Sequence, residues 1–345
     1  VRDFEKNTMG TVEMREMPMP EPAEDEVRIK IIYSSICGSD AHTLTGHLGE
    51  FEEGTKAMLP MTFGHELSGV IDKVGPKAEA LGYHVGDKVI ANYAKYCYAC
   101  DNCRSGHENL CSHVQFCMNG FAEYAVYHVT QVHKLPENYD LETAALIEPL
   151  AVTVHAAKRF PDINGANVSI IGCGPIGILL MQSCKALGAA KVLITDISDY
   201  RLELAKSLGA DYAINTAKVP YADAIAEVFG PDKADVTYEC AGNNATTDMA
   251  IQNSRKGSVI VLVAVFADWA KVDLARLNDS ELTLDTSMMY RHEDYVDALR
   301  FVAEGKIQLK PLISKHFAFR DFLSAYQYID ANRERTMKVV VDIQD

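Results

Sequence analysis

The chain has 345 residues, which is enough for about two domains of ~100–200 residues each. Its formal net charge of −15 argues against a nucleic-acid partner and against an acidic membrane surface, because both repel a negative protein. It contains no run of about 18 apolar residues that would span a membrane, and its first residues lack the apolar core of a signal peptide. We therefore expect a cytoplasmic protein with no nucleic-acid and no membrane partner.

The first half of the chain is predicted to be rich in β-strands. Runs with strand-like alternation cover 12–17, 26–33, 67–74, 87–91 and 122–129, and prolines and glycines separate them. This pattern favours an irregular, partly closed β-barrel.

Three places far apart along the sequence carry four residues with groups that bind zinc. Cys37 offers a thiolate, His65 an imidazole, and Glu66 and Glu148 offer carboxylates. Taken singly, each has an ordinary structural explanation, such as a small buried thiol or a hydrogen-bonded imidazole. Taken together, they form a plausible ligand set for a catalytic zinc, which uses three protein ligands and leaves one position open for water or substrate.

Four of the nine cysteines crowd into one short stretch: Cys97, Cys100, Cys103 and Cys111. In a cytoplasmic protein this spacing indicates a metal site rather than disulfides. Four thiolates with no open position are typical of a structural zinc site. An iron–sulfur cluster is the alternative, and the lack of any other redox group in the sequence argues against it.

A strand, a glycine-rich turn and a helix are predicted over 168–187, and the second half of the chain is organised around them. The turn matches G-x-G-x-x-G. Its first glycine permits a tight bend, the second gives a pyrophosphate access to the backbone, and the third lets the helix pack closely on the strand. The expected cofactor-binding residues of the turn are Gly172, Gly174, Pro175, Ile176 and Gly177.

A second strand, 191–195, ends in Asp196, close to the ~20-residue offset expected for a ribose-binding acid. A carboxylate at this position accepts hydrogen bonds from both ribose hydroxyls and repels a 2′-phosphate, so we predict NAD rather than NADP. Arg201 follows closely and would soften that preference. The alternative is an ordinary strand–turn–helix unit with a surface aspartate.

Beyond this turn, strands and helices continue to alternate. Strands are expected at 212–215, 235–240, 258–265 and 282–287, and helices at 199–208, 221–228, 243–253, 292–304 and 320–331, with a terminal strand at 337–343. Six parallel strands with helical crossovers make a doubly wound sheet, so the fold class is α/β.

Together these motifs resemble the zinc-dependent medium-chain dehydrogenase/reductase family over essentially the whole chain, and its polyol branch most of all. The stretches that carry the resemblance are Cys37-Gly38-Ser39-Asp40, Gly64-His65-Glu66, the four cysteines, 120–124, 147–150 and the glycine turn. The resemblance implies a doubly wound Rossmann domain at 149–288. It also implies a GroES-like irregular β-barrel catalytic domain at 1–148 and 289–345, which carries the four-cysteine zinc lobe.

The resemblance also implies roles at the catalytic zinc. Cys37 and His65 match zinc ligands, and Glu66 matches a carboxylate that binds the zinc or exchanges with it. Glu148 would bind the metal directly or hold its water. Asp40 matches an acid that is hydrogen-bonded to the ring of His65 and fixes its orientation.

Proton and hydride transfer are implied in the same way. Ser39 and His42 match a relay that carries the proton of the alcohol to solvent, although a turn serine and a surface imidazole would look alike in the sequence. Val263 and Val265 would lie near the nicotinamide. The zinc would act as a Lewis acid on the substrate hydroxyl while hydride passes to NAD.

The expected function is reversible, NAD-linked and zinc-dependent oxidation of a secondary alcohol to a ketone. The expected substrate is a polyol, a sugar alcohol or its phosphate, or a vicinal diol. The polyol branch carries Arg-Tyr where this chain has Tyr290-Arg291, so sorbitol itself is not assigned. We treat Tyr290, Arg291 and Phe116 as candidate substrate contacts.

Other functions stay open at this point. One is an enzyme similar to L-threonine 3-dehydrogenase or a simple secondary-alcohol dehydrogenase. Two come from other classes, namely a non-catalytic NAD-binding structural protein and a zinc-finger adaptor built on the four cysteines. Two zinc ions per chain, one catalytic and one structural, would favour the enzyme. By analogy with the family, we expect a homodimer or homotetramer.

Overall fold

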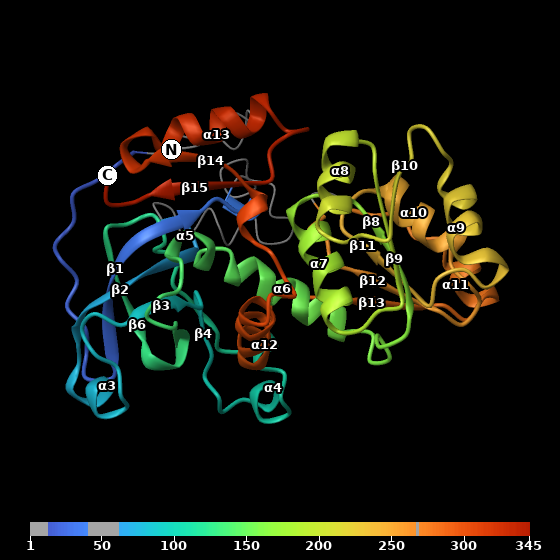
Figure 1. Ribbon diagram of the computed structural model, residues 1–345. Coiled ribbons are helices and arrows are strands. Elements are labelled where there is room, and N and C mark those ends of the chain that lie inside the picture. Colours follow the sequence, from blue (N-terminus) through green and yellow to red (C-terminus); the bar gives the residue numbers. More distant parts are fainter. Residues whose placement is uncertain (1–12, 41–61, 267–268) are drawn as a thin grey trace. The chain divides into compact units, whose positions relative to one another are not determined.

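The computed structural model describes residues 13–40, 62–266 and 269–345. The chain forms two compact units (Figure 1). The first contains Val1–Glu148 and Leu309–Asp345, and the second contains Pro149–Gln308. Among the residues that the structure describes, none of the helices has the length and apolar composition that a membrane crossing needs.

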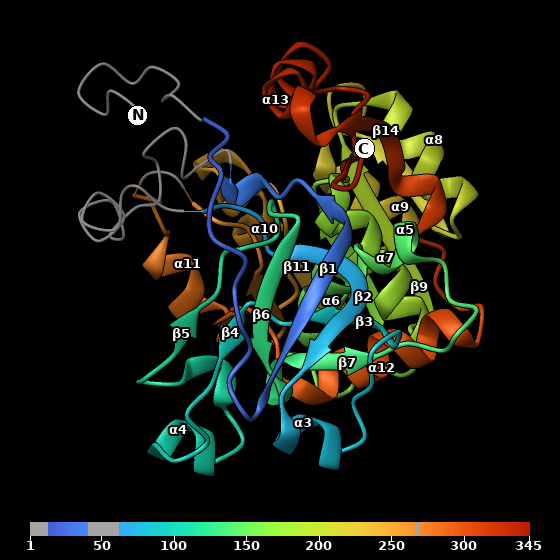
Figure 2. The ribbon, with the colours of Figure 1, turned by 90° about the vertical axis from the view of Figure 1, so that its left-hand side faces the viewer.

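The first unit is built on a seven-stranded sheet. Its strands are β1 (Glu26–Ser35), β2 (Glu66–Val74), β3 (Lys88–Ala91), β6 (Tyr124–His128), β7 (Val132–Lys134), β14 (Ile313–Ala318) and β15 (Lys338–Asp342). The order is β14-β15-β1-β2-β3-β7. Strand β6 also pairs with β1 and lies beside it (Figure 2). Val27, Ile29 and Ile31 of β1 are fully buried, as their alternation predicts.

Short elements complete the first unit. They are the helices α3 (Pro76–Ala80), α4 (Asp101–Arg104), α5 (Leu141–Ala144) and α13 (Phe322–Ala331), the strands β4 (Ala94–Lys95) and β5 (Gln115–Phe116), and the 3-10 helices η2 (Glu108–Leu110), η3 (Val129–Gln131), η5 (Lys310–Leu312) and η6 (Phe319–Asp321). The stretch with the four cysteines runs between the paired strands β4 and β5.

The second unit contains a six-stranded parallel sheet of order β10-β9-β8-β11-β12-β13. Its strands are β8 (Asn167–Ile171), β9 (Lys191–Asp196), β10 (Tyr212–Asn215), β11 (Val236–Glu239), β12 (Val259–Leu262) and β13 (Thr283–Thr286). Its helices are α6 (Ile147–Lys158), which begins just before the boundary, α7 (Pro175–Ala186), α8 (Asp199–Ser207), α9 (Tyr221–Phe229), α10 (Asn244–Asn253), α11 (Leu274–Asp279), α12 (His292–Ala303) and the 3-10 helix η4 (Gly230–Asp232). This strand order confirms the predicted doubly wound sheet.

Two expectations differ from the structure. The described residues of 12–17 form no strand, because Met14 and Met17 are exposed and have no buried face to pack. The segment 289–308, which the sequence analysis assigns to the first domain, lies in the second unit. Asp294 of α12 holds it there, since its carboxylate lies 2.8 Å from His155 Nδ1 and 2.7 Å from Lys158 Nζ of α6.

Candidate functional site

The register between β1 and β2 brings distant zinc-binding groups together. Ser35, the last residue of β1, pairs with Glu66, the first residue of β2. Cys37 follows β1 and His65 precedes β2, so both lie at the same end of this strand pair. The donor atoms of Cys37, His65 and Glu66 lie within 4.8 Å of one another. Three of the four expected donors therefore form one cluster.

Glu148 is buried near this cluster but outside the group of three. It lies in the first turn of α6. The negative charge of Glu148 interacts electrostatically with Tyr93 and with Lys338. The charge of Cys37 interacts with the same two residues. A carboxylate at this position can respond to the same cation as the group of three.

Asp40 lies against His65, as the resemblance implies. Oδ1 of Asp40 is 3.6 Å from Nδ1 of His65, and neither atom has a hydrogen-bond partner among the described residues. Oδ2 of Asp40 accepts a hydrogen bond from the backbone N–H of Cys37 at 3.0 Å. Burial lowers the pKa of His65, but the negative charges of Cys37 and Asp40 outweigh it and raise that pKa well above its usual value. So much negative charge around a buried imidazole fits a divalent cation, which would satisfy these groups.

The proposed proton relay is described only in part. Ser39 is half-buried and stands between Cys37 and Asp40 in the sequence. His42 lies outside the described residues, so its role stays a prediction.

Lys338 is a buried residue of this cluster that the sequence analysis missed. Its Nζ lies 2.7 Å from Oε1 and 2.5 Å from Oε2 of Glu66, and it donates a hydrogen bond to the carbonyl of Ile36 at 2.9 Å. Lys338 and Glu66 are 4% and 1% exposed, so the pair is almost fully removed from water. The only sequence signal is a lysine at the start of an apolar terminal strand.

An aromatic pair packs on the same cluster. The ring of Tyr93 lies 4.8 Å from that of His65, and the ring of Phe116 stacks on Tyr93 at 5.6 Å. Burial raises the pKa of Tyr93 strongly, so its hydroxyl keeps its proton at neutral pH. Phe116 was expected as a substrate contact and is about half exposed, whereas Tyr93 had no signal in the sequence.

The four cysteines of the lobe converge on one point. The sulfur of Cys100 lies 3.5 Å from that of Cys103 and 4.0 Å from that of Cys111, and the sulfurs of Cys97 and Cys103 are 3.9 Å apart. A zinc tetrahedron with bonds of about 2.3 Å has sulfur separations of about 3.8 Å. A cluster of several iron atoms would spread the thiolates further apart, so the spacing favours a single ion.

Electrostatics at the lobe agree with this geometry. Hydrogen bonds from backbone N–H groups lower the pKa of Cys100 to about 6, and the one from Cys103 has the largest effect. Burial and hydrogen bonds with the neighbouring sulfurs raise the pKa of Cys103 to about 12, because both favour its protonated form. A divalent cation would favour the thiolate instead.

The glycine turn has the geometry that its sequence predicts. Gly172 has φ +101°, which favours glycine. A Cβ on Gly177 would lie 1.9 Å from the carbonyl oxygen of Gly172, so only glycine allows the helix this close. A Cβ on Gly174 would meet nothing within 4 Å. Pro175 begins α7, and Ile176 follows it in the first turn.

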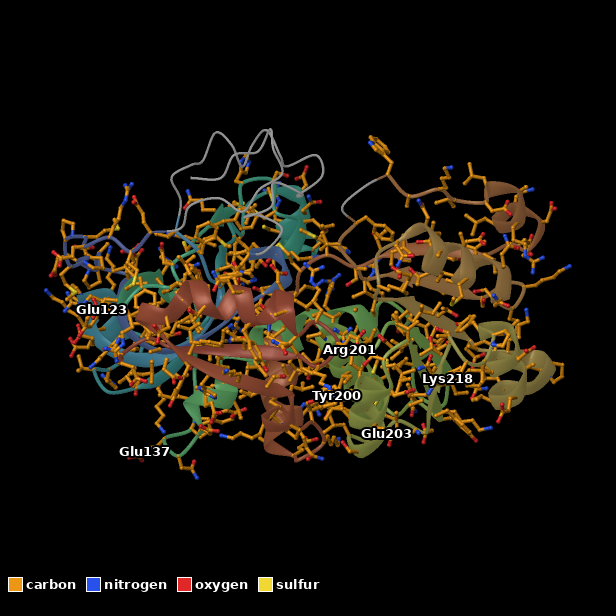
Figure 3. The ribbon with its side chains drawn as sticks, turned by 90° about the horizontal axis from the view of Figure 1, so that it is seen from above. Glu123, Glu137, Tyr200, Arg201, Glu203 and Lys218 are labelled. Atoms are coloured by element: carbon orange, nitrogen blue, oxygen red, sulfur yellow. The ribbon has the colours of Figure 1, made fainter. Side chains whose placement is uncertain are left out.

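Asp196 ends β9 with its carboxylate held by backbone N–H groups. Oδ2 accepts from Cys173 at 2.7 Å, and Oδ1 accepts from Ile197 and Ser198 at 2.8 and 2.9 Å. Arg201 lies on α8 (Figure 3), with its guanidinium 4.0 Å from Oδ2. The carboxylate is thus fixed beside the glycine turn, with one cation near it.

The other candidates of the second unit lie at strand and helix ends. Val263 and Val265 follow β12, and Val265 is 60% exposed. Arg291 precedes α12, and Tyr290 is fully buried with its ring edge-on to Tyr295 at 4.9 Å.

The β-sheet unit with two zinc-type donor sets and the dinucleotide-type turn of the second unit define a zinc-binding oxidoreductase. The chain belongs to the zinc-dependent medium-chain dehydrogenase/reductase family, in its polyol branch. Residues 23–137 match the alcohol dehydrogenase GroES-like domain family, and residues 175–304 match the zinc-binding dehydrogenase family.

Named relatives agree with this assignment. Sorbitol dehydrogenase of Halalkalibacterium halodurans is 33% identical over 328 residues, which cover 93% of each chain. L-threonine 3-dehydrogenase of an Anaeromyxobacter species is 31% identical over 98% of this chain and 96% of its own length. The crystal structure of Escherichia coli galactitol-1-phosphate dehydrogenase is 32% identical with a TM-score of 0.87, covering 97% of this chain and 98% of that one. The protein is therefore an oxidoreductase that acts on an alcohol or polyol.

Proposed function

We propose that the protein catalyses the reversible, NAD-linked oxidation of a secondary alcohol to a ketone. The proposed substrate is a polyol, a sugar alcohol or its phosphate, or a vicinal diol. The observation that carries the proposal is the cluster of Cys37, His65 and Glu66 in a chain that also has a G-x-G-x-x-G turn. Relatives that are named sorbitol and galactitol-1-phosphate dehydrogenase support this substrate class.

Two zinc ions per chain belong to the proposal. Cys37, His65 and Glu66 would hold the catalytic ion, with Glu148 as the further carboxylate, and the four cysteines would hold the structural one. Zinc would supply a Lewis acid and NAD a hydride acceptor.

The chain's own residues would then handle orientation and the proton. Asp40 fixes the ring of His65, which lies 3.6 Å away. Ser39 receives the hydroxyl proton of the alcohol and passes it towards solvent. Tyr93 and Phe116 offer an aromatic wall against which the carbon chain of the substrate packs.

NAD rather than NADP is proposed because of Asp196. Its carboxylate is held in place by three backbone N–H groups and would repel a 2′-phosphate. Asp196→Ser should lower the ratio of kcat/KM for NAD to that for NADP by at least about tenfold. Asp199→Ser, at an exposed carboxylate that pairs with Lys218, is the matched control and should leave the ratio unchanged. An equal effect of both variants would contradict a specific ribose contact.

The central experiment combines metal analysis with a substrate panel. We expect two zinc ions per chain and NADH formation with sorbitol, galactitol 1-phosphate or 2,3-butanediol. Cys37→Ser should abolish turnover and remove one zinc. Cys117→Ser, at a half-buried thiol of the same unit outside both cysteine-containing groups, should leave both unchanged. Undiminished turnover of Cys37→Ser with two zinc ions bound would refute the proposed site.

A second candidate is oxidation of L-threonine, which the relative of that name favours. NADH formation with threonine alone would select it. Assembly as a homodimer or homotetramer and a cytoplasmic location stay predictions, and light scattering at micromolar concentration tests the first.

A further inference from the structure

We propose that Lys338 is a positioning residue that weakens the hold of Glu66 on the catalytic metal, by sharing its carboxylate. The inference rests on the proposed catalytic zinc site. It adds a residue that the donor set does not contain, and it makes zinc affinity, rather than activity, the quantity that Lys338 controls.

The geometry of Lys338 leaves Glu66 between two cations. Nζ lies 2.7 and 2.5 Å from the two carboxylate oxygens, while the same carboxylate belongs to the donor group with Cys37 and His65. The third contact of Nζ is the carbonyl of Ile36, immediately before Cys37. Lys338 therefore joins both chain segments that supply the donors.

The backbone holds Lys338 in this place. β15 pairs with β1 so that Val340 is opposite Ser35, and Ile36 donates a backbone hydrogen bond to Val339 at 2.9 Å. Lys338, two residues before Val340, therefore comes level with Cys37. A long flexible side chain that is 4% exposed and has a fixed backbone cannot leave Glu66 without stranding a buried charge.

Charge explains why a lysine is useful here. Cys37, Asp40, Glu66 and Glu148 bring acidic groups close to one small region, and all of them attract a dication. A carboxylate that is paired with a buried ammonium gives less of its charge to the metal than a bare one does. A catalytic zinc must keep one position open for substrate. Lys338 thus prevents Glu66 from closing that position permanently.

The competing explanation is that Lys338 only ties β15 to β1 and β2. In that case its loss would destabilise the protein equally with and without zinc. If Lys338 shares Glu66 with the metal, its loss must destabilise the zinc-free protein more, because zinc then neutralises the stranded carboxylate. The two explanations therefore differ in zinc affinity, which a purely structural contact would not change.

The experiment compares zinc binding in the wild-type protein and in variants of the full chain. Competition with a chromogenic chelator measures the dissociation constant of the more weakly held zinc, while the four-cysteine zinc serves as an internal reference. Lys338→Met should lower that constant at least about tenfold. Lys338→Arg should keep the wild-type value. Lys310→Met, at an exposed lysine that pairs with Glu142 in the same unit, is the control and should change nothing.

Glu66→Gln supplies the decisive cross-check. Adding Lys338→Met to Glu66→Gln should not tighten zinc binding further, because no charged carboxylate remains to be released. If Lys338→Met folds only with zinc present and the double variant folds without it, the stranded charge is also demonstrated. An unchanged or weaker zinc affinity in Lys338→Met, or a double variant as unstable as the single one, overturns the proposal.

Failure of the proposed function would look different. If the weaker zinc responds to Lys338 as described but no alcohol in the panel reduces NAD, the function falls and the role of Lys338 stands. A cluster that takes up no zinc at all would overturn both.

Discussion

The substitution Gly177→Ala is expected to disrupt the packing of α7 on β8. In an exposed helix this change would add up to about 1 kcal/mol of stability through helix propensity. Here the new Cβ would lie 1.9 Å from the carbonyl oxygen of Gly172. The backbone of Gly172 is itself held in place, because its N–H donates a hydrogen bond to the carbonyl of Thr195 at 2.8 Å. Backbone cannot move aside as a side chain does, so overpacking of about 1–3 kcal/mol or more should dominate. For a unit of this size, each kcal/mol lowers the melting temperature by about 2–4 °C.

The matched control is Gly174→Ala in the same turn. A Cβ there meets nothing within 4 Å, and the residue already has an extended conformation with φ −74°. Scanning calorimetry should show a melting temperature close to that of the wild type. The methyl would stand where a pyrophosphate is expected, so titration calorimetry should show NAD binding weakened by at least about tenfold. An unchanged melting temperature for Gly177→Ala would refute the steric reasoning, and unchanged NAD binding by Gly174→Ala would place the phosphates elsewhere.

Two further predictions concern ion pairs. Burial lowers the pKa of His316, but hydrogen bonds with Asp342 and Glu142 raise it by more, so the net shift is upward. The ion pairs of His316 therefore stabilise the fold fully below the pKa of histidine in the unfolded chain. This stabilisation is lost as the pH rises through the raised pKa of the folded protein. His316→Gln should therefore cost about 1 kcal/mol or less near pH 6 and almost nothing near pH 9 in urea unfolding, and an equal cost at both would contradict this. Asp294→Asn should destabilise the second unit by about 1–3 kcal/mol, because it removes the buried negative charge between His155 and Lys158, while Lys158 keeps Asp297 at 2.7 Å; a loss below about 0.5 kcal/mol would contradict it.

Periodicity made much of the fold predictable. Alternation in 26–33 marked β1, and continuous apolar runs marked strands that are covered on both faces, such as β12. In the second half, the glycine turn supplied the starting point and the strand–helix alternation supplied the topology. These signals are local. They predict the elements correctly because the apolar side chains of each element are buried within the unit to which that element belongs.

Other elements had no local signal. Helix α6 was not predicted, because Ile147–Lys158 is buried on nearly all sides and shows no polar face. The place of 289–308 depends on the contact of Asp294 with α6, which connects residues more than 130 positions apart. Lys338 likewise acquires its meaning only through pairing with Glu66. Spacing along the sequence identifies candidate zinc donors. It cannot show that one of them, Glu66, already pairs with the ammonium of Lys338.

The arrangement of the zinc donors depends on two compensating irregularities in the ladder between β1 and β2. The register shifts by one residue between Arg28 and Ile29, and it shifts back between Ile31 and Tyr33. With the first shift alone, the pairing of Ile31 with Gly69 would continue to place Ser35 opposite residue 65, whereas the second shift places it opposite Glu66. The carbonyl of Ile32, at this shift, accepts a hydrogen bond from Ile343, just beyond β15.

The same C-terminal segment therefore stabilises the bulge and supplies the lysine that pairs with Glu66. A slip by one residue would turn Glu66 away from Cys37 and leave Lys338 without its carboxylate. Two unpaired buried charges would result, which makes such a slip unfavourable. The ion pair thus acts on register as well as on metal affinity, which explains why a buried charge is retained at the start of β15.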